Sequence, residues 1–303
     1  MPPENNQTVS GVPVTSAPVK IGKWKASRMI VRESWEVLKQ DKEIMLFPVF
    51  SSLVTMFAVV LMSVVYYFFV LNGNLGALNT SSDASLNTPL NYLTMFVYYL
   101  VVFFIVSFFE VCVLIVVQGR FSGQDLNMKD GLDGAKKNAG KILAWAAISA
   151  TVGVILQIIS DKSKILGKIV SFVLGSAWNL LTYFSLPALV IANLGVKDAF
   201  KESARVIRKN WGETIIVNFG VGLFFMVIFF VLAVFCVGAI ILAPVLPMFI
   251  LVGVFFVLAV IILSIISATL STIFKLALFN YARTGEVPKG FSRELIVGAV
   301  TNK

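Results

Sequence analysis

Long apolar stretches separated by short polar segments make up most of the chain after its first forty residues. Six such stretches occur, at residues 44–71, 90–117, 142–160, 165–193, 214–242 and 248–275. Each is long enough to cross a hydrocarbon core of about 30 Å as a helix. None shows the alternation of apolar and polar residues that marks a strand, and lipid offers no partner to an open backbone. The pattern therefore predicts an all-α membrane protein with six transmembrane helices.

Two charged segments, residues 27–43 and 196–213, precede the first and fifth stretches and carry apolar residues at helical spacing. This pattern is typical of amphipathic helices at a membrane surface, with Trp35 and Trp211 at headgroup depth. The alternative is that both segments are only the inner ends of the spans. Asp198 in the second segment favours a separate helix start. We therefore expect amphipathic interfacial helices on the cytoplasmic face.

The charged segments also resemble one another. Residues 33–41 (ESWEVLKQD) align with residues 202–210 (ESARVIRKN), and residues 128–131 (MKDG) are similar to residues 196–199 (VKDA). A unit made of an amphipathic helix and a helical hairpin would then occur three times. Chance similarity between basic interfacial helices is the alternative explanation, and the sequence alone leaves both open.

Basic residues are distributed very unequally between the two sides of the predicted spans. Of the 25 Lys and Arg residues, 22 fall in the segment before the first span, in two alternate connections or at the C-terminal end. The other connections carry only Lys162, Lys164 and Lys168. Because cytoplasmic loops are enriched in Lys and Arg, this bias predicts that both termini are cytoplasmic in a cell membrane.

The amino-acid composition supports the prediction of a membrane protein and narrows the range of possible activities. Hydrophobic residues make up 58% of the 303 positions, and the mean hydropathy is +0.88. The net charge of +9 does not indicate nucleic-acid binding, because the basic residues flank membrane spans. The chain has no histidine, and its two cysteines, Cys112 and Cys236, lie inside apolar stretches. We therefore expect no disulfide, no metal site, no catalytic site and no cofactor.

The chain divides into three regions on composition. Residues 1–26, rich in Pro, Ser and Thr near the start, are expected to be a disordered cytoplasmic tail. Residues 27–284 form the six-helix transmembrane domain, and residues 285–303 form a cytoplasmic C-terminal tail.

Three segments carry a resemblance to a known family: residues 34–53 (SWEVLKQDKEIMLFPVFSSL), 176–223 (which contain AWNLLTYFSLP) and 279–291 (FNYARTGEVPKGF). The chain resembles an uncharacterised prokaryotic family of six-helix membrane proteins, known only as a domain of unknown function. The likeness covers most of residues 28–291 in order. It implies an all-α protein of the cytoplasmic membrane and no particular activity. Relatives carry an asparagine near Glu110, so this acid is a local departure.

Glu110 is the clearest candidate for a polar site inside the membrane, since it lies in the second predicted span. A carboxylate there costs about 2.5–3.5 kcal/mol on insertion scales, so it should be paired, protonated or directed toward a cavity. One interpretation is a proton or cation site. The other is a structural pair with Lys275, which lies at a similar depth in the sixth span.

Asn179 is the second candidate, because it precedes Pro187 in the fourth span. Proline removes a backbone donor and frees the carbonyl of Tyr183, so a kink is expected there. Polar residues at a broken helix form sites in transporters. Packing by interhelical hydrogen bonds is the simpler explanation.

Arg205, Arg208 and Lys209 in the second charged segment are candidates for contacts with lipid headgroups. They could equally serve only to set the topology. The interpretation that the sequence favours is a non-enzymatic membrane protein that organises lipid or partner proteins through basic cytoplasmic helices. The alternative is a small-solute or ion transporter that uses Glu110 and Asn179. Membrane lipid is the expected partner, with a second copy of the chain or another membrane protein as further possibilities.

Overall fold

The computed structural model describes residues 23–69, 89–162, 165–211, 219–242 and 246–296. All regular structure in these ranges is helical. The elements are α1 (Lys23–Gln40), η1 (Lys42–Met45), α2 (Leu46–Phe69), α5 (Pro89–Phe121), α6 (Met128–Lys137), α7 (Ala139–Asp161), α8 (Leu166–Thr182), α9 (Ser185–Val190), α10 (Val196–Trp211), α11 (Phe219–Leu242) and α12 (Leu246–Thr284). The all-α prediction is therefore confirmed for the described residues.

Five helical stretches are long and apolar enough to cross a membrane: Lys42–Phe68, Pro89–Phe121, Ala139–Asp161, Leu166–Val190 and Phe249–Thr284. They match five of the six predicted spans. The predicted span at 214–242 begins outside the described residues, and the apolar part of its helix, Phe224–Ala239, is shorter. The described residues thus show a multi-pass membrane protein with five candidate spans.

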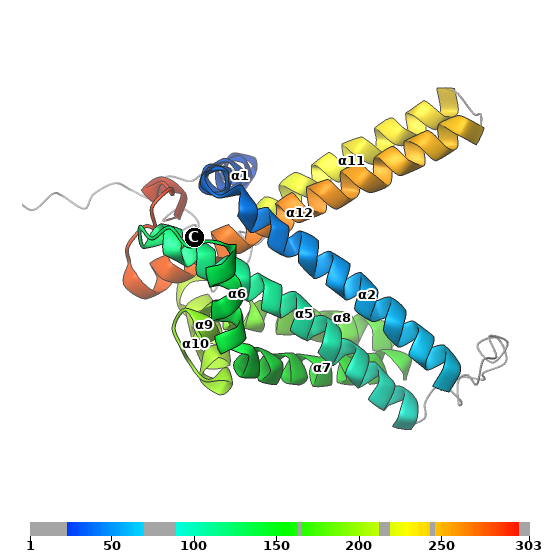
Figure 1. Ribbon diagram of the computed structural model, residues 1–303, viewed down its shortest axis with the longest axis horizontal. Helices are drawn as coiled ribbons and strands as arrows, with labels where there is room; N and C mark the ends of the chain where they lie inside the picture. The colour runs from blue at the N-terminus through cyan, green and yellow to red at the C-terminus, as the bar shows by residue number, and fades with distance from the viewer. Residues whose placement is uncertain (1–22, 70–88, 163–164, 212–218, 243–245, 297–303) are drawn as a thin grey trace, which may run out of the picture.

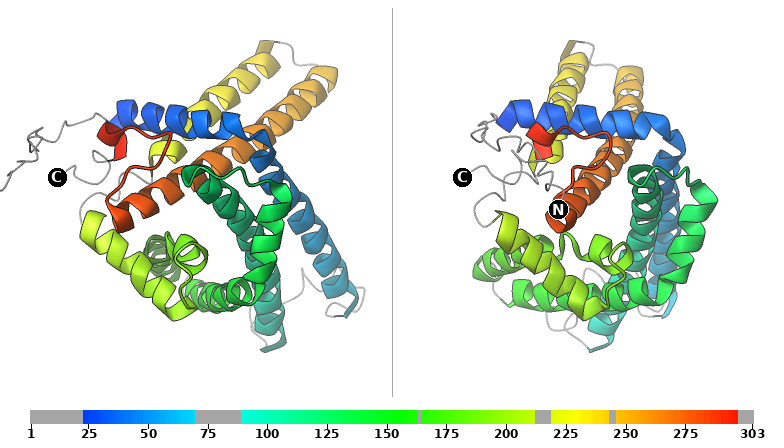
Figure 2. Two further views of the ribbon diagram at one scale, coloured as in Figure 1. Left: turned by 60° about the vertical axis from the view of Figure 1, so that its left-hand side comes forward. Right: turned by 90° about the vertical axis from the view of Figure 1, so that its left-hand side faces the viewer.

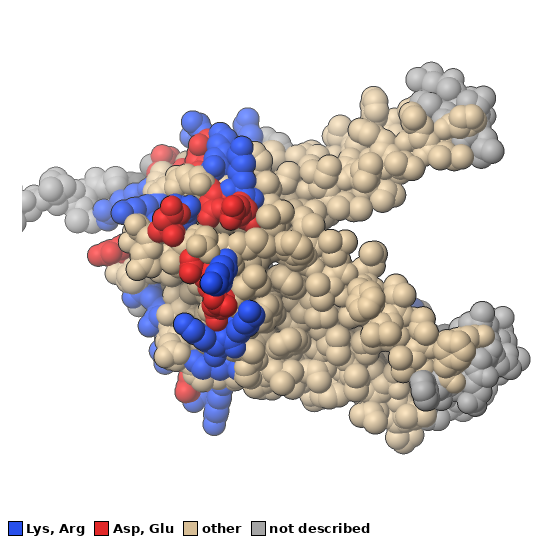
Figure 3. Space-filling view, in the orientation of Figure 1, with Lys and Arg blue, Asp and Glu red and all other residues tan. Residues whose placement is uncertain are grey.

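The long helices form two groups that diverge from a common base. Helices α2, α5, α7 and α8 lie together, while the hairpin of α11 and α12 leaves this bundle at a wide angle (Figure 1). The outer parts of both groups expose large apolar side chains, such as Phe57 on α2 and Phe230 on α11. On the face seen in Figure 3, the charged side chains gather at the base from which the two groups diverge. Apolar surface away from the charged end is the surface that lipid would cover.

Three shorter helices, α1, α6 and α10, encircle the charged end (Figure 2). Each precedes a hairpin of long helices. Helix α6 packs on α5 and α10 packs on α8 and α9, which end the hairpins before them, while α1 packs on the last hairpin, α11 and α12. In α1 and α10 the aligned serines, Ser34 and Ser203, are both fully buried, and Val37 and Val206 are nearly so. The aligned residues therefore have equivalent positions, as a threefold repeat requires.

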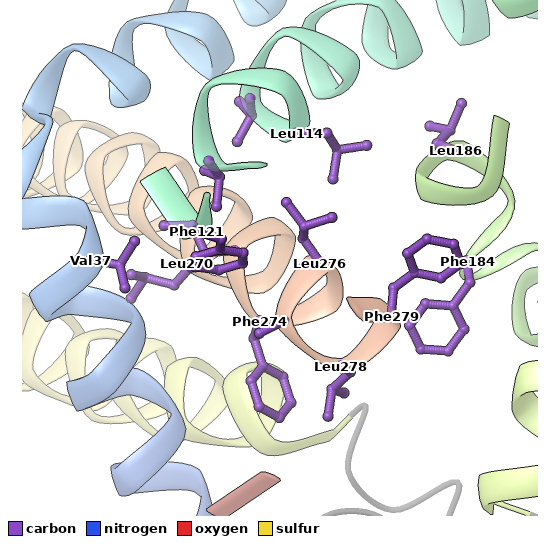
Figure 4. Packing of buried hydrophobic residues seen from close by; sticks show 14 of the residues in the cluster. Val37, Leu114, Phe121, Phe184, Leu186, Leu270, Phe274, Leu276, Leu278 and Phe279 are labelled. Atoms are coloured by element: carbon purple, nitrogen blue, oxygen red, sulfur yellow. The ribbon is translucent and has the colours of Figure 1, made fainter. Parts of the chain in front are cut away.

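The buried core lies at the charged end of the molecule. Its largest fully buried side chains come from α2, α5, the junction of α8 and α9, and α12, and they include Phe47, Leu114, Phe184, Ile273 and Phe279. The rings of Phe184 and Phe279 are stacked at 6.1 Å between centroids (Figure 4). Tertiary packing therefore holds this end together, and the apolar halves of the long helices extend away from it.

Helix α12 continues for nine residues beyond Lys275, where the predicted span ended. Nothing in the sequence breaks the helix before Gly285, which adopts a positive φ of 75°. The chain then folds back across the charged end, where Phe291 packs edge-on against Phe121 at 6.0 Å between ring centroids. The first part of the predicted C-terminal tail is thus packed against the bundle.

The N-terminal and C-terminal regions are joined by side-chain hydrogen bonds. The backbone N–H and the hydroxyl of Ser292 both donate to the carboxylate of Glu33 on α1, at 3.0 and 2.6 Å. Helix α1 itself begins at Lys23, four residues inside the predicted disordered tail, while the rest of that tail lies outside the described residues. The segments before the first span and after the last one are therefore in contact at the charged end.

Gly290 is the position where this return segment tolerates no side chain. Its φ is +91°, and a Cβ atom there would lie 2.8 Å from Val37 Cγ2. We expect Gly290→Ala to lower the stability of the purified protein by about 1–3 kcal/mol, because it adds strain and a clash. The thermal unfolding midpoint in detergent and lipid measures this. Gly140→Ala is the matched control, since nothing lies within 4 Å of its Cβ position. Equal midpoints for the two variants would contradict the account.

Candidate functional site

An ion pair joins two of the long helices where the buried core begins. Lys275 Nζ on α12 donates to Glu110 Oε1 on α5 at 2.6 Å, and the two side chains are 17% and 20% exposed. Glu110 lies eleven residues before Phe121 at the end of α5, which is about 17 Å along the helix. At such a depth neither charge is stable alone, so each offsets the desolvation of the other.

The ammonium group of Lys275 has a second neighbour from a third helical segment. Its Nζ lies 5.0 Å from the centroid of the Tyr183 ring, within the range of a cation–π interaction. Tyr183 follows the last residue of α8, Thr182, and precedes α9. The second helices of all three hairpins, α5, α8–α9 and α12, therefore meet at this cluster of Glu110, Tyr183 and Lys275.

The break between α8 and α9 is where the sequence predicts a kink, four residues before Pro187. The backbone N–H of Phe184 donates to Ser203 Oγ on α10 at 3.0 Å, and Ser203 is fully buried. The side chain of an amphipathic helix thus satisfies a donor that the helix break leaves free. Ser34, the serine at the aligned position of α1, has a buried hydroxyl group that forms no hydrogen bond among the described residues.

The structure does not bring Asn179 into this cluster. Asn179 lies on α8 with an exposed side chain. The fourth span contributes Tyr183 instead, and sequence reasoning considered only the carbonyl of that residue. The signal was present in the sequence, because a break next to Pro187 turns the side chains on its two sides in different directions.

Two further polar contacts link the inner end of α5 to its neighbours. Asn280 Nδ2 on α12 donates to Gln118 Oε1 at 2.7 Å. Arg120 contacts Asp41 at 3.4 Å and Asp125 at 2.6 Å. Sequence reasoning missed both contacts, since their partners are 79 to 162 residues apart. Together with Glu110, Gln118 and Arg120 give α5 polar contacts with three residues that lie far away in the sequence, Lys275, Asn280 and Asp41.

The chemistry that these groups can perform is limited. Among the described residues, no group of three or more His, Cys, Asp or Glu side chains could hold a metal ion. Cys112 and Cys236 are free and buried. Glu110 and Lys275 form an ion pair in which each group offsets the charge of the other.

The predicted headgroup-binding residues lie on the outer face of α10. Lys201, Ala204, Arg205 and Arg208 line one surface depression. Arg205 contacts Glu202 at 2.7 Å and Lys201 contacts Asp198 at 3.5 Å. The side chain of Lys209, the third predicted residue, lies outside the described residues. Arg205 and Arg208 therefore share one surface, as their spacing of three residues on a helix requires.

Fold and composition together define a multi-pass, all-helical membrane protein whose charged residues gather at one end. The model of a family of unknown function (DUF6159) matches residues 90–290, about two thirds of the chain, so the protein belongs to this family. No curated protein matches the chain. The matched range includes Glu110, Tyr183, Lys275 and the whole of α10.

The ion pair can be tested by a double-mutant cycle. We expect Glu110→Gln or Lys275→Met alone to destabilise the protein by about 3–5 kcal/mol, because either leaves an unpaired charge in an apolar setting. The double variant should recover much of this loss, since it removes both charges. Thermal unfolding of the purified protein measures the loss of stability in each of the two single variants and in the double variant. Additive losses in the double variant would show that the two side chains do not interact.

Proposed function

We propose that this protein is a non-enzymatic, six-span protein of the cytoplasmic membrane, with both termini inside, that binds anionic lipid headgroups through its charged end. In this way it organises lipid, or partner proteins, at the inner surface. The observation that carries the proposal is the ring of α1, α6 and α10 around the charged end, together with the basic depression on α10.

The orientation rests on the distribution of charge. The connections that carry most of the Lys and Arg residues all contribute to the charged end, and this is the cytoplasmic side under the positive-inside rule. Helix α11 provides the sixth crossing, because it pairs with α12 along the hairpin. With six crossings, the first and last described residues lie on the same side.

Headgroup binding rests on the form of α10. Its inner face buries Ala199, Ser203 and Val206, so the helix is fixed on the bundle and its basic face is turned outward. An amphipathic helix at the end of membrane spans lies at headgroup level. There each basic side chain near an anionic surface contributes about 1 kcal/mol.

Transport through Glu110 and Asn179 is the second candidate, and the geometry supports it less. Glu110 has its charge matched by Lys275, and Asn179 lies outside the cluster. On the cytoplasmic side of the pair, Leu114 and Val117 of α5 are fully buried in a packed core. A route for a solute would have to pass this apolar layer.

The lipid proposal predicts the effect of charge reversal on α10. We expect Arg205→Glu with Arg208→Glu to lower the preference for phosphatidylglycerol over phosphatidylcholine by at least about fivefold, since about 1 kcal/mol is lost per charge. Spin-labelled lipids bound to the purified protein report this preference by electron paramagnetic resonance. Lys168→Glu, at the opposite end of the bundle, should leave it unchanged. An unaltered preference in the double variant would refute a role for α10.

A further inference from the structure

Helix α1 has a second basic face, and sequence reasoning did not single it out. The inner face buries Ile30, Val37 and Leu38 against the bundle, each at most 3% exposed. Lys25, Arg28 and Arg32 are exposed. They lie three and four residues apart, so they occupy one stripe along the outer side of the helix. The stripe is about 10 Å long at 1.5 Å per residue.

The two acidic side chains of α1 and Asp41 after it each have a partner that is not part of the stripe. Glu33 accepts two hydrogen bonds from Ser292, at 2.6 and 3.0 Å. Glu36 pairs with Lys39 at 3.1 Å, and Asp41 contacts Arg120 at 3.4 Å. Within the part of the chain that the structure describes, Lys25, Arg28 and Arg32 therefore form no ion pair.

Helix α10 differs in this respect. Two of the three cations in its depression, Lys201 and Arg205, already have carboxylate partners, and only Arg208 has none among the described residues. None of the three cations of the stripe on α1 has such a partner among the described residues, so none of them has to give up an ion pair in order to bind an anion.

The position of α1 places this stripe beside lipid. The helix runs across the base of the α11–α12 hairpin, with which it packs (Figure 2). Its C-terminal end leads through η1 into α2, where Leu46 and Phe50 expose their side chains. The helix that carries the stripe therefore leads into lipid-facing surface, and it lies at the level where headgroups meet hydrocarbon.

We propose that Lys25, Arg28 and Arg32 form the principal binding site for the phosphates of anionic phospholipids, and that α10 contributes less. This inference rests on the proposed function and names the site that dominates it. Arginine suits this role, because its planar guanidinium group can hold phosphate oxygens with two hydrogen bonds. Because Glu33 accepts hydrogen bonds from Ser292, its carboxylate does not compete with lipid phosphates for these three cations.

The test compares two matched double variants of the full-length protein: Arg28→Gln with Arg32→Gln on α1, and Arg205→Gln with Arg208→Gln on α10. Spin-labelled phosphatidylglycerol and phosphatidylcholine report lipid preference, and the thermal midpoint checks folding. We expect the preference for phosphatidylglycerol over phosphatidylcholine to fall by at least about fivefold in the α1 variant. The α10 variant should lose distinctly less. Arg28→Lys with Arg32→Lys keeps the charge and should retain most of the preference.

Three outcomes separate the inference from the proposed function. A loss confined to the α10 variant would overturn the inference and leave the proposed function standing. Wild-type protein without any preference for phosphatidylglycerol would overturn both. Inorganic phosphate at millimolar concentration should not displace the labelled lipid, and displacement would show that the stripe binds free phosphate instead. If the α1 glutamine variant does not fold, the lysine variant and Lys25→Gln decide by the same measurement.

Discussion

The contact between α5 and its neighbours at the charged end is the feature on which the rest of the structure depends. Hydrocarbon offers no partner for a polar group, so polar contacts between the units have to gather where the chain is packed. Glu110, Gln118 and Arg120 follow one another along α5 and bind Lys275, Asn280 and Asp41. The first two contacts tie α5 to α12, and the third ties α5 to the segment before η1. In the outer halves of the helices the described residues show a hydrogen bond between α2 and α5, from Tyr66 to Asn91 at 3.4 Å, and there the α11–α12 hairpin diverges from the bundle.

Two of the short helices at the charged end, α1 and α10, accept hydrogen bonds from other segments of the chain. Ser203 of α10 accepts the hydrogen bond of Phe184 at the broken helix, and Glu33 of α1 accepts those of Ser292. Each of these helices thus completes the packing of a distant segment and turns a charged face outward. The same helices that close the core therefore form the surface that we propose meets the lipid headgroups.

Much of the fold could be predicted from the sequence, because length and hydropathy determine which segments can cross a membrane. The positions of five spans, the amphipathic helices and the break near Pro187 all follow from local patterns. The contact between Glu110 and Lys275 was anticipated as one of two interpretations, from similar depth alone. The side chain of Asn179 is exposed, and depth along a helix does not show which way a side chain points. The Glu33–Ser292 contact, which spans 259 residues, and the divergence of the α11–α12 hairpin depend on tertiary packing, which no local pattern records.

Accessibility of single cysteines from the two sides of the membrane tests the central claim, that the charged end is cytoplasmic and the far ends of the helices lie outside. Lys136→Cys on α6 and Lys162→Cys after α7 are exposed positions at opposite ends of one helical unit, in a background where Cys112 and Cys236 are replaced by serine. A membrane-impermeant maleimide should label the first only in inside-out vesicles and the second only in right-side-out vesicles. Labelling of both positions from the same side would contradict the account.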